Sequence, residues 1–148
     1  MKRIATLALL ATGLAQAGGF WITSKAPAAG IDALVLVQVL GCHNPEDAVL
    51  TATAEGIVNG QRRSLPLEFR PAGKGSYVVK KQALPAGTWV LALTARLGTM
   101  VTSELIPLAA GGEVPASHRG QSPDKPGKFI HKQIRAADVE SALRQPAS

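Results

Sequence analysis

Between residues 31 and 108, apolar side chains alternate with other residues in short runs that Gly, Pro and Asn interrupt. Alternation with period two places one set of side chains on one face of a β-strand, whereas an amphipathic helix repeats after about 3.6 residues. No run in this stretch sustains the helical period. The pattern predicts an all-β sandwich of seven antiparallel strands at residues 20–24, 34–40, 48–58, 61–70, 76–84, 88–97 and 100–108.

Turn residues divide these runs at the expected places. Asn59-Gly60 lies between two alternating runs, and a two-residue type I′ turn needs the positive φ angles that Asn and Gly adopt. Gly98 is suited to the first central position of a type II′ turn. Pro66 cannot donate a ladder hydrogen bond, so we expect the strand at 61–70 to lie at the edge of a sheet.

The same alternation predicts which side chains fill the core. The run at 34–40 is apolar on both faces, which indicates a central strand. In the second strand, Val35, Val37 and Val39 share one face, and Leu34, Leu36, Gln38 and Leu40 share the other. The expected inward side chains are Leu65, Leu67 and Phe69 in the fourth strand, and Trp89, Leu91, Leu93 and Ala95 in the sixth.

The N-terminus has the three parts of a secretory signal peptide. Lys2 and Arg3 form a positive head, residues 4–14 are mainly apolar, and residues 15–17 read Ala-Gln-Ala. The apolar run is shorter than the roughly 20 residues that span a bilayer. We therefore expect residues 1–17 to be removed and the mature chain, without a transmembrane segment, to be periplasmic or extracellular.

The composition changes after the last expected strand. Residues 110–148 hold Gly111-Gly112, four prolines and one aromatic residue, Phe129, so a flexible tail is expected there after a sandwich at 18–109. Within the tail, Val139 and Leu143 are four residues apart, which favours a short helix at 136–145. A helix of that length is marginal in water unless it docks on another surface.

Charge and residue counts exclude several classes of protein. The chain of 148 residues has 16 Lys and Arg against 10 Asp and Glu, and without Lys2 and Arg3 the balance is 14 against 10, or +4. Aromatic residues make up 4% of the chain, too few for the stacking platforms that bind single-stranded nucleic acid. One Cys excludes an intramolecular disulfide, and three His with that Cys do not make a zinc module of the usual spacing.

Two motifs carry a family resemblance. Residues 75–77 read G-x-Y, and residues 84–93 read L-x-x-G-x-W-x-L-x-L. This pattern resembles small exported bacterial immunoglobulin-like domains, in particular the YtkA-like group and its relatives among copper-resistance and nickel-transport accessory domains. The resemblance implies an immunoglobulin-like β-sandwich in which Trp89 and the aliphatic residues after it fill the space between two sheets. Leu91 stands near the position of a core Cys in disulfide-bonded relatives, so apolar packing alone is expected to hold this core.

The dipeptide Cys42-His43 is the strongest candidate for thiol or metal chemistry. A thiol beside an imidazole can bind a soft metal such as Cu(I) or form a reactive thiolate. The copper-handling members of the resembled group use several His or Met ligands, whereas the mature chain has Met100 alone and places His118 and His131 in the expected tail. A structural Cys is the favoured interpretation, with an intermolecular disulfide or redox thiol as alternatives.

The other polar motifs favour surface roles. Glu46-Asp47 is a pair of adjacent acids in a turn, whose side chains point in different directions, and no nucleophile motif accompanies it. Arg62-Arg63 and Lys80-Lys81 are basic pairs on expected edge strands, where such charge discourages aggregation between sheets.

Two hypotheses about function follow. The first is an exported, non-catalytic module without a cofactor that binds another envelope or secreted protein and no nucleic acid. The alternative is a periplasmic accessory protein that handles copper or nickel through Cys42 and His43. The pattern leaves the specific partner and the oligomeric state open.

Overall fold

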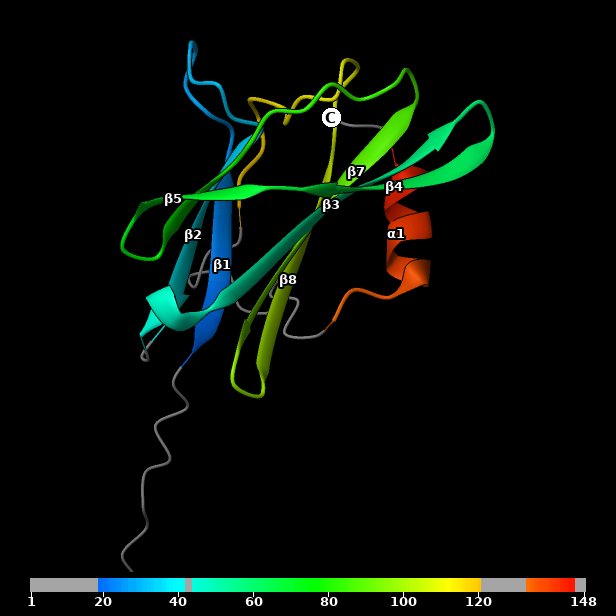
Figure 1. The fold of residues 1–148 in the computed structure, drawn as a ribbon. Helices are drawn as coiled ribbons and strands as arrows, with labels where there is room; N and C mark the ends of the chain where they lie inside the picture. The colour runs from blue at the N-terminus through cyan, green and yellow to red at the C-terminus, as the bar shows by residue number, and fades with distance from the viewer. Residues whose placement is uncertain (1–18, 42–43, 121–132, 146–148) are drawn as a thin grey trace, which may run out of the picture.

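The structure is a computed structural model that describes residues 19–41, 44–120 and 133–145. It contains two four-stranded antiparallel sheets, which we name sheet A and sheet B (Figure 1). In spatial order, sheet A consists of β1 (Phe20–Lys25), β2 (Val35–Gly41), β6 (Ser76–Val79) and β5 (Phe69–Gly73). Sheet B consists of β4 (Gln61–Leu67), β3 (Val49–Val58), β7 (Thr88–Leu97) and β8 (Met100–Pro107). A short 3-10 helix, η1 (Pro45–Asp47), and one α-helix, α1 (Ala136–Leu143), complete the described elements.

The two sheets share one hydrophobic core, which confirms the all-β prediction at the level of two facing antiparallel sheets. The predicted inward residues of β7 are all buried. In β2, the structure shows that Val35, Val37 and Val39 form the buried face. Of the set predicted for the run at 61–70, Leu67 is buried, while Leu65 and Phe69 are partly buried and pack against the core. Strand β2 lies between β1 and β6 and is therefore central in its sheet, as predicted.

Two expected strands end earlier than predicted. The run at 61–70 forms two strands, because β4 ends at Leu67 in sheet B and β5 begins at Phe69 in sheet A. The alternation continues through this crossing because Leu67 and Phe69 both face the shared core. Both strands lie at sheet edges, which agrees with the expected place of Pro66. The run at 76–84 is a strand only to Val79, after which the Lys80 amide donates a 2.9 Å hydrogen bond to the carbonyl of Glu68.

The predicted hairpin turns are present. Asn59 and Gly60 have φ angles of 50° and 76°, the conformation that a type I′ turn requires. They join β3 to β4, whose pairing starts at Val58 and Gln61. Gly98 has a φ angle of 58° and lies in the tight turn between β7 and β8.

Trp89 packs directly on the backbone of the neighbouring strand. It lies opposite Gly56 in the pairing of β7 with β3, and its side chain is 3% exposed. A Cβ atom on Gly56 would overlap the indole ring. The indole Nε1 donates a 2.8 Å hydrogen bond to the carbonyl of Pro85, which fixes the ring in the core. Glycine is therefore the residue that lets this ring fit between the sheets.

The described residues after β8 differ from the expectation of a flexible tail. Val114 is buried in the main core, and the 114–120 segment runs against β1. Helix α1 packs on the outer face of sheet B, with Val139, Ala142 and Leu143 against Val90 (Figure 1). Apolar residues are sparse in this part of the sequence, but Val139, Ala142 and Leu143 share one face of the helix, and Val114 enters the main core. Burial of these side chains offsets the entropy cost of ordering the chain. A helix is thus observed at Ala136–Leu143, within the expected 136–145, and it is docked.

Some predictions concern residues outside this description. The expected signal peptide, residues 1–17, and the 121–132 part of the expected tail are not among the described residues. Within the described ranges, no helix is both long enough and apolar enough to cross a membrane.

Candidate functional site

The residues predicted for thiol or metal chemistry, Cys42 and His43, lie outside the described residues. Within residues 19–41, 44–120 and 133–145, no group of three or more His, Cys, Asp or Glu side chains could hold a metal ion. The thiol and metal interpretations of these two residues therefore stay predictions.

A polar cluster that sequence reasoning missed joins the two sheets from inside. Ser24 on β1 and Glu104 on β8 are 3% and 6% exposed, and the Ser24 hydroxyl donates a 2.8 Å hydrogen bond to Glu104 Oε2. His118 Nε2 lies 2.8 Å from Ser24 Oγ and 3.4 Å from Glu104 Oε1. The cluster thus places a carboxylate, a hydroxyl and an imidazole where the edge strands of the two sheets meet.

The geometry of this cluster differs from that of a Ser-His-acid catalytic triad. In such a triad, the acid binds one ring nitrogen of the His and the Ser binds the other. Here Glu104 and Ser24 both contact His118 Nε2, and the Ser24 hydroxyl proton points to Glu104 instead of to the imidazole. The contacts at Nε2 therefore differ from those of a triad, and the arrangement holds β1, β8 and the 114–120 segment together.

One signal in the sequence could have found this buried acid. Thr102, Glu104 and Ile106 alternate in phase along β8, and Ile106 is a core residue.

Gly120 also contacts β1 beside the cluster, because a Cβ atom on Gly120 would overlap the backbone of Ser24. The 114–120 segment thus lies close against the strand β1, whose other side pairs with β2.

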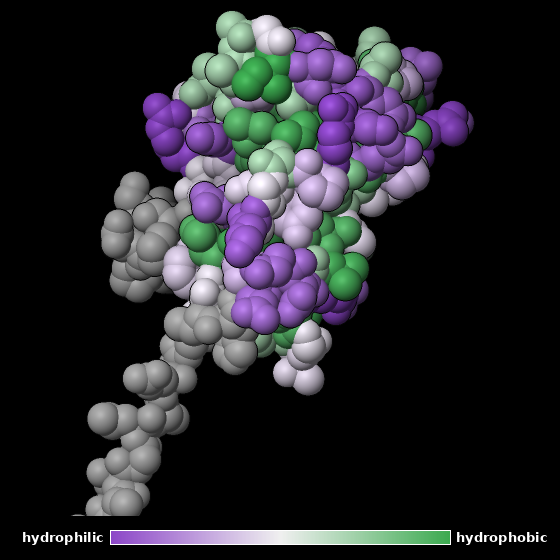
Figure 2. All heavy atoms as spheres, turned by 60° about the vertical axis from the view of Figure 1, so that its left-hand side comes forward, coloured by the Kyte–Doolittle hydropathy of each residue, from purple (hydrophilic) through white to green (hydrophobic). Residues whose placement is uncertain are grey.

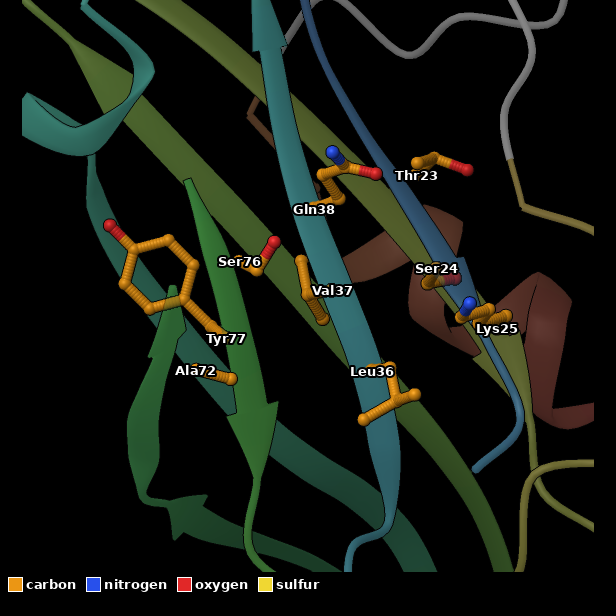
Figure 3. A pocket seen from close by; sticks show the side chains of 9 residues that line it. All are labelled: Thr23, Ser24, Lys25, Leu36, Val37, Gln38, Ala72, Ser76 and Tyr77. Carbon is orange, nitrogen blue, oxygen red and sulfur yellow. The ribbon is translucent and has the colours of Figure 1, made fainter. Parts of the chain in front are cut away.

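The outer face of sheet A carries a shallow concavity of about 250 Å³ (Figure 3). Its centre is a polar row across three strands, since Thr23 on β1 pairs with Gln38 on β2, which pairs with Ser76 on β6. Gln38 is exposed, and Leu36, two residues before it on the same face, is half-buried. The remaining lining residues are Ser24, Lys25, Val37, Ala72 and Tyr77.

Hydrophobic and hydrophilic residues are mixed on this side of the molecule. Figure 2 turns the side of β1, β2 and β5 toward the viewer and shows small hydrophobic groups separated by hydrophilic residues. The half-buried Leu40 and Val78 lie on the same outer face as Gln38 and Leu36. This face therefore offers apolar area and hydrogen-bonding groups side by side.

The outer face of sheet B has a different cover. Helix α1 lies over Ile57, Val90 and Leu105 and buries the apolar end of the face. Beside the helix remains a groove of about 330 Å³ that Arg62, Arg96 and Arg135 line, with threonine hydroxyls from β3 and β7. The two outer faces thus differ, because a helix of the chain itself covers part of one of them.

The predicted basic pairs form ion pairs on the surface. Arg62 contacts Glu55 at 3.4 Å and Glu140 at 3.2 Å, and Lys80 pairs with Glu68. The hydrogen bond and charge of Lys80 lower the pKa of Glu68. Lys81 binds Glu113 at 2.8 Å, and this contact lowers the pKa of Glu113 and raises the pKa of Lys81. Arg62-Arg63 lies on the edge strand β4, as expected. Lys80-Lys81 does not, because β6 ends at Val79 and lies between β2 and β5, so this pair is exposed charge in the segment after a central strand.

Comparison with known proteins found no family model, no curated protein and no solved structure that matches this chain.

Proposed function

We propose that the protein is an exported, non-catalytic module with immunoglobulin-like topology that binds another exported or envelope protein through the outer face of sheet A. The contrast between the two outer faces carries this proposal. The chain covers the apolar end of sheet B with its own helix, whereas sheet A carries no such helix among the described residues.

The strand order supports the immunoglobulin-like topology. An immunoglobulin constant-type domain has strands A, B, E and D in one sheet and C, F and G in the other. The order β1-β2-β6-β5 corresponds to A-B-E-D, and β3-β7-β8 corresponds to C-F-G, with β4 added beside β3. The core aromatic differs from that of antibody domains, because Trp89 lies on β7, the counterpart of strand F.

The mixed character of sheet A supports binding to a protein. Interfaces of non-obligate complexes are about as apolar as the rest of a protein surface and combine apolar contact with hydrogen bonds. Leu36, Leu40 and Val78 supply apolar area, while Gln38 at the centre offers both donors and an acceptor. The partner would therefore place mixed apolar and polar side chains across β1, β2 and β6.

Export rests on the N-terminal pattern of Lys2, Arg3, the apolar run and residues 15–17. The intact mass of the protein recovered from the periplasm or medium should correspond to a chain that begins at Gly18. A recovered chain that retains residues 1–17 would contradict export by this route.

A photo-crosslinking side chain at Gln38 tests the binding surface in the producing cell. The matched control is the same side chain at Ser64, which is exposed on the outer face of sheet B. We expect one discrete crosslinked protein from Gln38 and none from Ser64. With that protein purified, Gln38→Arg should weaken its binding at least tenfold, and Ser64→Arg should leave it unchanged. Equal crosslinks from both positions, or none from Gln38, would reject this surface.

The metal-handling alternative rests on Cys42 and His43, and no observation on the described residues favours it. Titration of the exported chain with copper and nickel tests it separately. Stoichiometric binding that Cys42→Ser abolishes would replace the function proposed here.

A further inference from the structure

The groove beside α1 is lined by three arginines that differ in their ion pairing. Arg62 pairs with Glu55 and Glu140, and Arg135 pairs with Asp138 at 3.1 Å. Among the described residues, Arg96 on β7 has no ion-pair partner, and its side chain is exposed. The groove therefore has three guanidinium groups on its wall, of which one is open to an external anion.

The floor of the groove supplies hydroxyl groups next to Arg96. Thr94 precedes Arg96 by two residues on the same outer face, and Thr51 lies directly opposite Thr94 on β3. Thr94 shares a 3.1 Å hydrogen bond with Ser103, whereas Thr51 makes no hydrogen bond through its side chain to another described residue. A hydroxyl can donate one hydrogen bond to an anion, so Thr51 adds a neutral donor beside the charge of Arg96.

Helix α1 fixes the far wall of this groove. The Arg135 side chain binds Asp138 through both Nε and Nη2, and the Arg135 backbone amide donates a 2.9 Å hydrogen bond to the same carboxylate. These contacts raise the pKa of Arg135 and hold its guanidinium group at the start of the helix. Val139 on the docked face of α1 packs against Val90 of sheet B, and the start of the helix lies beside Ala92 and Thr94 at the groove.

We infer that this groove is a binding site for a small ligand with an oxyanion group, a carboxylate or a phosphate, which binds Arg96 and the Thr51 hydroxyl. The planar guanidinium group matches both oxyanions through two parallel hydrogen bonds. The groove volume of about 330 Å³ is in the range of small-molecule sites. Glu55, Glu140 and Asp138 pair with the other two arginines, so Arg96 is the guanidinium group left to pair with the oxyanion of the ligand. This site lies on sheet B and is independent of the surface proposed on sheet A.

Amide chemical-shift titration of the exported chain tests the inference, with inorganic phosphate and succinate as separate probes at constant ionic strength. We expect saturable shifts at Thr51, Thr94 and Arg96 with at least one probe. Arg96→Gln should weaken that binding at least tenfold, and Thr51→Val should weaken it several-fold. The matched control is Arg63→Gln, which removes the same charge from an exposed position outside the groove and should change affinity less than twofold.

The two probes identify the ligand class. Saturation by phosphate alone assigns a phosphate ligand, saturation by succinate alone assigns a carboxylate, and saturation by both assigns the shared oxyanion chemistry. Shifts that do not saturate with either probe, or equal weakening by Arg96→Gln and Arg63→Gln, would overturn the inference. The amide spectrum of Arg96→Gln also reports whether the variant is folded, because shifts in β2 and β6 should match those of the parent chain.

Discussion

Ser24 donates a 2.8 Å hydrogen bond to Glu104 from a position 80 residues away in the chain, and this bond links β1 of sheet A to β8 of sheet B. Both residues lie in the interior, where a carboxylate without partners would be costly. His118 supplies the third member and brings the 114–120 segment against the junction. The cluster therefore ties two sheet edges and the segment after β8 into one structural unit.

Removal of His118 alone should destabilise the protein more than removal of both His118 and Glu104. His118→Leu leaves Glu104 as a buried charge with one hydrogen bond, and the expected loss is about 3 kcal/mol in the free energy of unfolding. In the double variant Glu104→Leu with His118→Leu, apolar packing replaces the pair and most of that loss should disappear. Urea denaturation of the variants measures both values. Glu104→Leu alone completes the set. If the double variant loses as much free energy of unfolding as the two single variants together, the residues act independently.

Gly56→Ala should be destabilising because of one neighbour. Its new methyl group would overlap the Trp89 ring, and overpacking of this kind costs about 1–3 kcal/mol. In a Trp89→Leu background the ring is gone, so the same glycine substitution should cost much less. Denaturant midpoints of the four chains give the coupling between the two positions. Equal costs in both backgrounds would mean that the ring and Gly56 are not in contact.

The contact between Lys81 and Glu113 should be visible in a pH titration. Lys81 lowers the pKa of Glu113, so the folded chain binds this proton less readily than the unfolded chain. The contribution of this ion pair to the free energy of unfolding is then present at neutral pH and is lost as the pH falls through the lowered pKa of Glu113. The carboxyl ¹³C shift of Glu113 should report a midpoint below the usual range for Glu. Lys81→Met should raise that midpoint, while Lys74→Met, in an exposed turn, should leave it in place.

Helix α1 should detach without unfolding of the sandwich. Its buried residues belong to a cluster separate from the main core. Val139→Asp removes the docking contribution of a buried valine, about 2 kcal/mol, and an eight-residue helix does not persist alone. Amide exchange should then show lost protection in α1 and unchanged protection in β3 and β7. Ser141→Asp, which places the same charge at an exposed position of the same helix, is the control. Simultaneous loss of protection in the sheets would show that α1 is part of the main core.

Alternation alone was enough to predict most of the sheet residues. Trp89, Leu91, Leu93 and Ala95 repeat with period two, and burial of one face of β7 produces that period directly. The crossing at Glu68 could not be found in this way, because alternation records which side chains face the core and carries no information on which strand is the neighbour.

The buried cluster and the groove depend on contacts between distant parts of the chain. A charged residue is seldom fully buried, and the phase of Glu104 with Ile106 is the one local sign of its inward position. His118 reaches it from a segment whose Gly and Pro content indicated flexibility. Arg96 and Arg135 become neighbours of one groove through the docking of α1, which no local pattern predicts.

The most direct test of the account compares the two tryptophans, because its central claim is that both sheets share one core with Trp89 at the centre. Trp89 is 3% exposed, whereas Trp21 is half-buried and lies on the edge strand β1. Trp89→Ala should reduce the free energy of unfolding by about 3–5 kcal/mol or prevent folding. Trp21→Ala should lower the denaturant midpoint far less. Small and equal effects of the two substitutions would contradict a shared core between the sheets.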